Sequence, residues 1–288
     1  MHSNIFTVSA ILNEAEIKLK NQGIQTFALD SQLLLSRVLN LNDIGDLLLK
    51  LDVKISPIHY NKYTILLNRR LKHEPIAYIV GSKNFWNQKY IVDKNVLIPR
   101  PETELIIEVI LKRFSPTIDY KFNILDLGTG SGCIILSLLS ELKFSIGIGV
   151  DHSQKALHIA QLNAIKLQMN KRVKFLVSNW FDSLDTNYKF DIIISNPPYI
   201  HTDEWLYLDK SVKDFEPKNA LTDNKDGLEN YRIIAKDFIQ FLKRNGILIL
   251  EIGYNQKNKI KQIFQIKDYK IQFLKDLQNI TRIAILKK

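Results

Sequence analysis

Residues 123–132 read Asn-Ile-Leu-Asp-Leu-Gly-Thr-Gly-Ser-Gly, a short apolar run that ends in glycines at every second position. The run is typical of a buried β-strand, and residues 131–142 have the periodicity of a helix. Glycines between a strand and a helix allow a tight turn and let a ligand approach the backbone where the helix begins. Residues 123–142 therefore predict the first strand, loop and helix of an α/β sheet.

Strands and helices alternate along the rest of the chain. We expect strands at residues 123–127, 146–150, 173–177, 191–195, 247–252, 269–274 and 282–286. Helical patterns lie between them at residues 131–142, 153–167, 228–244 and 256–263. This alternation favours a seven-stranded, mostly parallel sheet with helices on both faces. Residues 201–227 form one long irregular segment, and such segments are often functional.

The chain before this sheet has a different pattern. Residues 1–72 carry apolar residues at helical spacing and predict a bundle of four short helices. Two apolar runs at residues 76–80 and 90–92 flank turn residues, which predicts a β-hairpin. We therefore divide the chain into an N-terminal helical domain (1–75), a β-hairpin linker (76–98) and an α/β domain (99–288).

The composition is that of a globular protein, with 45% hydrophobic and 24% charged residues among 288. The single cysteine, Cys133, excludes an intrachain disulfide and a zinc site built from cysteines, and it fits a reducing, cytoplasmic location. The six histidines are not spaced as a metal site, so no metal is expected. We see no signal peptide and no apolar run long enough to cross a membrane.

The net charge is +10, which has two interpretations. A strongly basic chain can bind an acidic partner such as nucleic acid or a ribonucleoprotein. However, the lysines are scattered and form no block of like charges, which also fits a basic composition spread over all surfaces. Charge alone does not identify the partner.

The glycine loop and an acid after the second strand point to a nucleoside-containing ligand. Asp151 ends the strand at 146–150, where a carboxylate can accept hydrogen bonds from both ribose hydroxyls; alternatively, it caps the helix that begins near Ser153. The loop spacing is neither the dinucleotide pattern nor a P-loop. A cofactor with a ribose and a polar amino-acid tail suits it better, and Asp126 can face a positive group on that ligand.

A second constellation follows the strand at 191–195, namely Asn196-Pro197-Pro198-Tyr199. Proline fixes φ and donates no hydrogen bond, so this turn is rigid and its carbonyls can accept. Asn196 adds a side-chain acceptor, and Tyr199 adds a flat wall. The turn predicts a planar slot for a group that bears NH2, such as a carboxamide or an amino group of adenine or cytosine. The alternative is an ordinary turn that ends a strand.

These residues resemble the class I S-adenosylmethionine-dependent methyltransferases that modify planar amino groups, whose fold is a Rossmann-like, seven-stranded, mostly parallel sheet. Further motifs are similar to those of the HemK/PrmC family of peptide chain release factor N5-glutamine methyltransferases. They are Pro75-Ile76-Ala77-Tyr78-Ile79-x-Gly81, Phe85-Trp86, Leu97-Ile98-Pro99-Arg100-Pro101-Glu102-Thr103-Glu104, Trp180-Phe181 and Phe215-Glu216-Pro217-x-x-Ala220-Leu221. The match runs from about residue 28 to residue 288.

The resemblance implies the cofactor S-adenosylmethionine and, as substrate, the glutamine of the Gly-Gly-Gln motif in bacterial class 1 release factors. It implies that cofactor contacts come from Gly128, Thr129, Gly130, Ser131, Gly132, Asp151, Trp180 and Asn196. Asn196, Pro197, Pro198 and Tyr199 would form the substrate slot. Asn196 Oδ1 and the Pro197 carbonyl would accept the glutamine NH2, and Tyr199 would pack on the amide plane, which makes these three the candidate catalytic residues. The N-terminal helices would bind the release factor.

The sequence departs from the family at two places. Asn179 stands before Trp180 where the family often has aspartate, which removes a negative charge near the adenine. Residues 211–217 match the family's Asp-Val-Arg-x-x-Glu-Pro only in part, so no catalytic role is assigned to them. We interpret Arg100 and Glu102 as partners in structural ion pairs.

Three alternatives remain open from the sequence. A DNA or RNA amino-methyltransferase has a similar slot, but no separate basic domain or aromatic stacking platform is visible. A glutamine methyltransferase acting on a large-subunit ribosomal protein is closer to the reaction that the resemblance implies and is harder to exclude. A non-catalytic adaptor would need neither the glycine loop nor residues 196–199. We expect a monomer that makes no direct contact with nucleic acid.

Overall fold

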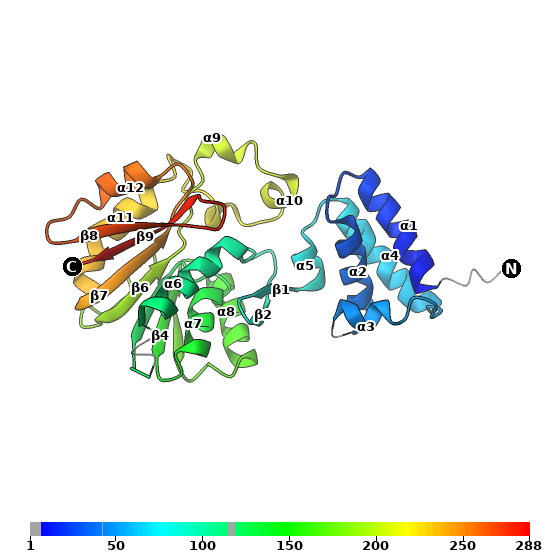
Figure 1. Ribbon diagram of the computed structural model, residues 1–288, viewed down its shortest axis with the longest axis horizontal. Helices are drawn as coiled ribbons and strands as arrows, with labels where there is room; N and C mark the ends of the chain where they lie inside the picture. Colours follow the sequence, from blue (N-terminus) through cyan, green and yellow to red (C-terminus); the bar gives the residue numbers. More distant parts are fainter. Residues whose placement is uncertain (1–6, 42, 115–118) are drawn as a thin grey trace. The chain divides into compact units, whose positions relative to one another are not determined.

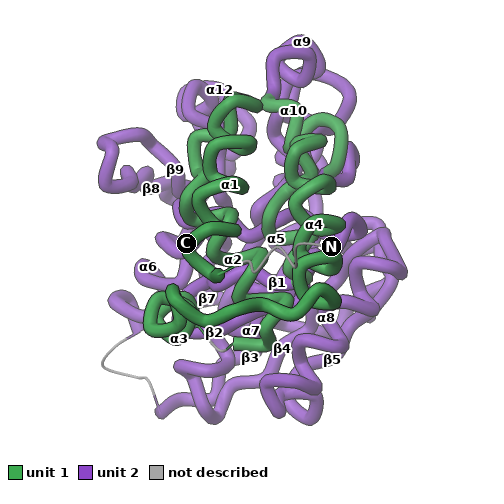
Figure 2. The backbone as a smooth tube through the Cα atoms, turned by 90° about the vertical axis from the view of Figure 1, so that its right-hand side faces the viewer, with its two compact units in different colours: residues 1–81, 209–215 green, residues 82–208, 216–288 purple. Residues whose placement is uncertain are grey.

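A computed structural model describes residues 7–41, 43–114 and 119–288 of the chain. The chain separates into two units, coloured differently in Figure 2. The first holds residues up to Gly81 together with 209–215, and the second holds residues 82–208 and 216–288. The return of residues 209–215 to the first unit was not predicted from the sequence. The division into functional parts at residues 75 and 98 stays a prediction.

The first unit is helical, as its periodicity predicts. Its helices are α1 (Val8–Asn21), α2 (Phe27–Val38), α3 (Ile44–Leu48), α4 (Pro57–Leu71), α5 (Ile76–Val80) and α10 (Lys210–Lys213). Thr7 caps α1, and Ser56 caps α4 with proline at the first helical position, so local residues fix both starts. The apolar faces of α1, α2 and α4 form one core, beside which Arg70 pairs with the buried Asp30 at 2.7 Å.

The strand predicted at residues 76–80 is wrong, because these residues form the single-turn helix α5. Their β-branched and aromatic side chains favour a strand. However, Pro75 precedes the turn, and Gly81 ends it with φ of 75°, the left-handed conformation of a helix C-terminus. Ile79 is buried in the core of the first unit, and this burial outweighs strand propensity.

The hairpin itself is shorter than expected and lies within the second unit. It consists of β1 (Ser82–Phe85) and β2 (Gln88–Ile91). Asn163 on helix α8 (Gln154–Lys166) accepts a hydrogen bond from the Ile91 N–H at 2.7 Å and donates one to the Ile91 carbonyl at 3.0 Å. The Tyr90 hydroxyl forms a hydrogen bond with Ser137 on helix α7 (Cys133–Glu141) at 2.7 Å. The hairpin is therefore packed onto the helices of the second unit.

The second unit is built on the predicted seven-stranded sheet. Its strands are β3 (Asn123–Leu127), β4 (Ile146–Asp151), β5 (Val173–Val177), β6 (Phe190–Ser195), β7 (Leu242–Glu251), β8 (Lys270–Lys275) and β9 (Thr281–Lys287). Their spatial order is β5-β4-β3-β6-β7-β9-β8, in which only β9 runs antiparallel to its neighbours. The chain order of the strands reverses between β3 and β6, which is where ligands bind in open α/β sheets.

Helices cover both faces of this sheet. They are α6 (Glu104–Phe114), α7 (Cys133–Glu141), α8 (Gln154–Lys166), α11 (Glu229–Phe241) and α12 (Lys257–Ile263). The unit also contains the short helix α9 (Thr202–Trp205) and the 3-10 turns η1 (Pro101–Thr103) and η3 (Lys218–Ala220). Successive strand residues face opposite sides: Ile124 packs in the core with α6 and α7, and Leu125 in the core with α11 and α12. Figure 1 shows these two helix groups on their separate sides of the sheet.

The largest boundary error lies where α11 meets β7. The helix predicted to residue 244 ends at Phe241, and the strand predicted from residue 247 begins at Leu242. Leu242 is buried and pairs with Phe190 of β6, so sheet pairing outweighs the helical pattern there. Within residues 7–41, 43–114 and 119–288, none of the helices combines the length and apolarity that a membrane crossing requires.

Candidate functional site

A cavity of about 520 Å³ opens at the carboxyl ends of the parallel strands. Its wall includes Gly128 and Gly130 after β3, Asp151 at the end of β4, Trp180 after β5 and Asn196 after β6. Residues 217–224 of the irregular segment complete the wall. Four strand ends thus bring residues predicted from separate motifs to one cavity.

The glycine loop has a left-handed backbone, which glycine adopts most readily. Gly128, Gly130 and Gly132 have φ values of 71°, 56° and 78°. The backbone N–H groups of Gly128 and Thr129 both donate to the Val150 carbonyl at 2.9 Å, which ties the loop to β4. Side-chain atoms at Gly128 or Gly130 would meet open space, so the bare backbone there faces the cavity.

Asp151 holds the glycine loop as well as facing the cavity. Its Oδ2 accepts from the Gly130 N–H at 3.0 Å, and its Oδ1 accepts from the Ser153 N–H at 2.9 Å. Ser153 itself caps α8 through its side chain. A carboxylate has about four acceptor positions, so capacity for ribose hydroxyls remains after these two bonds.

The other predicted loop residues do not line the cavity. Thr129 and Ser131 are buried, and neither they nor Gly132 line the cavity. The Thr129 hydroxyl donates to Asp126 Oδ2 at 2.7 Å. Burial raises the pKa of Asp126 to about 7, against the opposing effect of that hydrogen bond. Asp126 Oδ1 has no hydrogen-bond partner among the described residues, so one buried acceptor stays available beneath the loop.

Trp180 and Asn179 lie in a tight turn after β5. Trp180 has φ of 53°, and its carbonyl accepts from the Ser178 hydroxyl at 2.9 Å. Asn179 donates to Asp182 at 3.0 Å. Both Asn179 and Trp180 line the cavity, so the indole and an amide, rather than a carboxylate, form this part of the wall.

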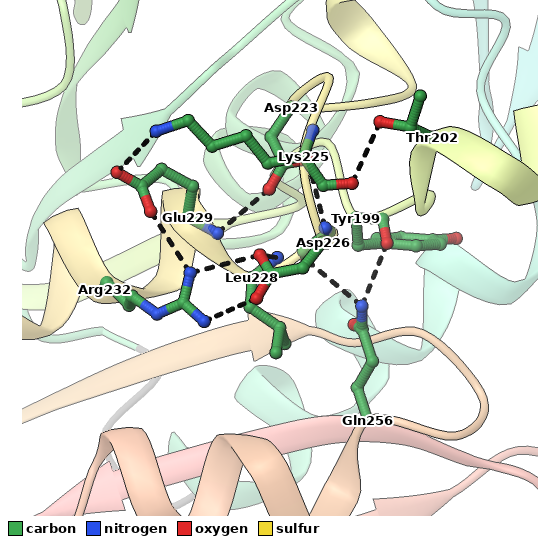
Figure 3. Close-up of polar contacts among 10 residues, drawn as sticks. Tyr199, Thr202, Asp223, Lys225, Asp226, Leu228, Glu229, Arg232 and Gln256 are labelled. Carbon is green, nitrogen blue, oxygen red and sulfur yellow. Dashed lines mark hydrogen bonds and ion pairs between the residues drawn. The ribbon is translucent and has the colours of Figure 1, made fainter.

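The turn Asn196–Tyr199 is fixed by hydrogen bonds to side chains from distant elements. The Asn196 NH2 group donates to Thr103 on η1 at 3.2 Å, and no hydrogen bond to its Oδ1 is present among the described residues. Asn230 donates to the Pro198 carbonyl at 2.8 Å. Gln256 donates to the Tyr199 carbonyl at 2.9 Å, as Figure 3 shows. Asn196 and Pro198 line the cavity, whereas Pro197 and Tyr199 do not.

Behind the turn lies Glu251, a fully buried carboxyl at the end of β7. The Tyr199 hydroxyl is 3.4 Å from its Oε1, and Tyr231 donates to its backbone carbonyl at 2.8 Å. Burial raises the pKa of Glu251 to about 7. Sequence reasoning missed Glu251, although a charged residue at the end of the apolar run 247–252 marks the edge where ligands bind.

Arg100 forms the ion pair that the sequence suggested, and its partner is Glu216 at 2.5 Å. Glu216 also accepts from the Ile98 N–H at 3.1 Å. The two motifs around Arg100 and Glu216 therefore join each other beside the cavity wall at Pro217. No ion pair of Glu102 is present among the described residues.

Comparison with known proteins gives the family. Residues 10–81 match the family described as the PrmC N-terminal domain, and residues 118–284 match a methyltransferase domain family. A release factor glutamine methyltransferase from Buchnera aphidicola is 40% identical over 260 residues, which cover 90% of this chain and 92% of that protein. The chain belongs to the release factor glutamine methyltransferase family.

Two further similar proteins extend the comparison. A bifunctional methyltransferase from Rickettsia prowazekii is 42% identical over 295 residues. That match covers 96% of this chain and 57% of the relative, so the chain spans little more than half of that protein's length. The crystal structure of a methyltransferase from Pyrococcus furiosus has a TM-score of 0.50 and 18% identity, and it covers 78% of this chain and 96% of that chain. The predicted class I methyltransferase fold is thereby confirmed.

Enzymes of this family and fold use S-adenosylmethionine, and the cavity residues fit it. Asp151 can accept ribose hydroxyls, and the exposed backbone at Gly128 and Gly130 allows close approach. Asp126, which the sequence suggested for a positive group of the ligand, is fully buried beneath the loop and does not line the cavity. Trp180 lines the same cavity, where an indole can pack against a planar base.

Proposed function

We propose that this protein transfers a methyl group from S-adenosylmethionine to the side-chain nitrogen, N5, of a glutamine. The proposed substrate is the glutamine of the Gly-Gly-Gln motif in bacterial class 1 peptide chain release factors. Family membership supports the reaction class. The observation that carries the proposal is the Oδ1 of Asn196, which lies on the same cavity as Asp151 and the glycine loop.

The turn offers two acceptors to the substrate amide. Asn196 Oδ1 is one, because the NH2 group of the same side chain donates to Thr103 and so fixes the side-chain orientation. The Pro197 carbonyl is the other, because no hydrogen bond to it is present among the described residues, whereas its two successors are bonded. Two acceptors match the two N–H bonds of a primary carboxamide.

The chemistry that the residues supply is orientation. S-adenosylmethionine, when bound, supplies a methyl group carried on a positively charged sulfur. A carboxamide nitrogen is a poor nucleophile because its lone pair is delocalised. Asn196 and Pro197 hold both N–H bonds, so the nitrogen stays directed at the cavity. Pro197 and Pro198 fix the turn, and acceptors placed in advance need no reorganisation during the reaction.

Tyr199 would pack against the plane of the substrate amide. Its hydroxyl contacts Glu251, and its carbonyl is held by Gln256, so the ring is fixed at both ends. In the same proposal the helical first unit binds the release factor, in line with the match of residues 10–81 to the PrmC N-terminal domain. The protein would act as a cytoplasmic monomer without direct contact to nucleic acid.

A methyl-transfer assay with labelled S-adenosylmethionine tests this function. Release factor, a large-subunit ribosomal protein and DNA are offered in parallel, and labelled proteins are mapped by peptide mass spectrometry. We expect a single methyl group on the glutamine of Gly-Gly-Gln. Label on the ribosomal protein or on DNA instead would support the cofactor but contradict the proposed substrate.

A further inference from the structure

Two of the three successive carbonyls in the turn are occupied by side chains that no sequence motif singled out. Asn230 Nδ2 donates to the Pro198 carbonyl at 2.8 Å. Gln256 Nε2 donates to the Tyr199 carbonyl at 2.9 Å. The Pro197 carbonyl between Asn196 and these bonds is left without such a partner among the described residues.

Gln256 joins three segments with one amide group. Its Nε2 also donates to the Gly227 carbonyl at 3.1 Å, and its Oε1 accepts from the Gly253 N–H at 2.9 Å. The turn after β6, the loop before α11 and the loop after β7 therefore meet at this side chain (Figure 3). Gly227 has φ of 73°, and a Cβ there would lie 2.3 Å from the Tyr199 carbonyl oxygen, so glycine permits this approach.

Asn230 is held equally firmly, because it lies in the first turn of α11. Asp223 accepts from the N–H groups of Gly227 and Glu229, both at 3.0 Å, and so anchors the start of that helix. Arg232 forms ion pairs with Asp226 at 2.5 Å and with Glu229 at 3.1 Å (Figure 3). Asn230 also lines the cavity, so its side chain lies both at the cavity wall and against the turn.

We propose that Asn230 and Gln256 are positioning residues that hold the turn in shape and cover two of its carbonyls, leaving Asn196 Oδ1 and the Pro197 carbonyl as the acceptor pair. This inference rests on the proposed glutamine methylation. It adds that selectivity for one amide orientation comes from occupying the competing acceptors.

The physical reason is competition between neighbouring acceptors. Asn196 Oδ1 and the backbone carbonyls of residues 196–199 are all acceptors, and a substrate NH2 has only two N–H bonds. If the Pro198 carbonyl were free, the amide could bind in a second pose, because Pro198 lines the cavity. Tyr199 does not line it, so Gln256 acts by holding the turn in shape. A misplacement of about 1 Å can lower a rate by about 100-fold. The Asn230 donor that occupies the Pro198 carbonyl removes the competing pose.

The test uses isosteric changes in the full-length protein. Asn230→Asp and Gln256→Glu each replace the donating NH2 with an oxygen that faces a carbonyl, and each keeps the acceptor oxygen. Gln262→Glu is the matched control, since it makes the same change on an exposed residue of the same helix α12. Gln256→Met serves as a neutral second variant that removes both functions of the amide.

We expect kcat on the release factor to fall roughly 10- to 100-fold in Asn230→Asp and Gln256→Glu. The dissociation constant for S-adenosylmethionine should match that of Gln262→Glu, and the fall in kcat should exceed what any lowering of the melting temperature accounts for. Hydrogen exchange at the Ile200 amide, which donates to the Leu221 carbonyl at 2.9 Å, should accelerate in the Gln256 variants.

The two proposals fail in different ways. If the wild-type enzyme methylates another substrate, the release factor is ruled out as the substrate. The variants are then compared on that other substrate. Variants that retain the wild-type kcat and Ile200 exchange rate overturn the positioning role while the methylation stands. If Gln256→Glu and Gln256→Met lose rate only in proportion to a lowered melting temperature, the residue is merely structural, which also overturns it.

Discussion

Arg100 and Glu216 lie 116 residues apart in the chain, and their side chains meet at 2.5 Å. The Glu216 side chain is 1% exposed, whereas that of Arg100 is 28% exposed. The pair joins the segment that carries Thr103 to the segment that carries Pro217, so it fixes two parts of the site by one contact. Breaking the pair should therefore lower the free energy of unfolding mainly because the buried Glu216 loses its partner.

Arg100→Met should lower the free energy of unfolding by about 3–5 kcal/mol, because it leaves a buried carboxylate without its countercharge. The double variant Arg100→Met/Glu216→Gln should recover much of that loss, since it removes the unpaired charge. Urea unfolding of the wild type and both variants measures this. A loss below about 1 kcal/mol in the single variant would show that the pair behaves as an exposed one.

Asp151→Asn should weaken binding of S-adenosylmethionine by about 10- to 100-fold, because hydrogen bonds to a charged acceptor contribute about 1.5–3 kcal/mol. The amide also presents one NH2 group to the Gly130 and Ser153 N–H donors, which should loosen the glycine loop. Titration calorimetry measures the affinity. Asp185→Asn, an exposed change outside the cavity lining, is the control and should leave it unaltered.

Asn196→Ala should abolish detectable methyl transfer while cofactor binding remains measurable. The variant loses the side-chain acceptor, and it also leaves the Thr103 hydroxyl without its donor. Single-turnover transfer and a separate binding titration distinguish the two effects. Full activity in Asn196→Ala would remove Asn196 from the proposed acceptor pair.

Glu251 should make stability depend on pH. Burial raises its pKa from 4.5 to about 7 in the folded protein, where Glu102, Tyr199 and Arg282 are the nearby titratable groups. The unfolded chain ionises first as the pH rises, so the stabilisation is complete below about pH 4.5 and is lost as the pH rises through about 7. The difference between these two pKa values corresponds to a change of about 3 kcal/mol in the free energy of unfolding.

The difference in unfolding free energy between wild type and Glu251→Gln isolates this effect, because glutamine does not titrate. Measured by urea unfolding between pH 4 and pH 8, the wild type should lose stability relative to the variant with rising pH. A constant difference across this range would mean that Glu251 titrates alike in the folded and unfolded states.

Local patterns were sufficient for the sheet and for the residues at its edge. The strands at 123–127 and 191–195 are short apolar runs with turn residues directly after them, and both form as expected. Because parallel strands end at one edge, Gly128, Asp151 and Asn196 could be assigned to one site without knowing any contact. Strand periodicity and glycine conformation are properties of neighbouring residues, which is why sequence alone reveals them.

The partners of those residues were decided by packing between distant segments. Gln256 lies 57 residues from the Tyr199 carbonyl that it binds, and Thr103 lies 93 residues from Asn196. Residues 76–80 have strand propensity yet form a helix, since burial of Ile79 and the left-handed turn at Gly81 favour one helical turn. Side chains that place a turn rather than react carry no local signature, so only the folded chain shows which asparagine or glutamine performs that role.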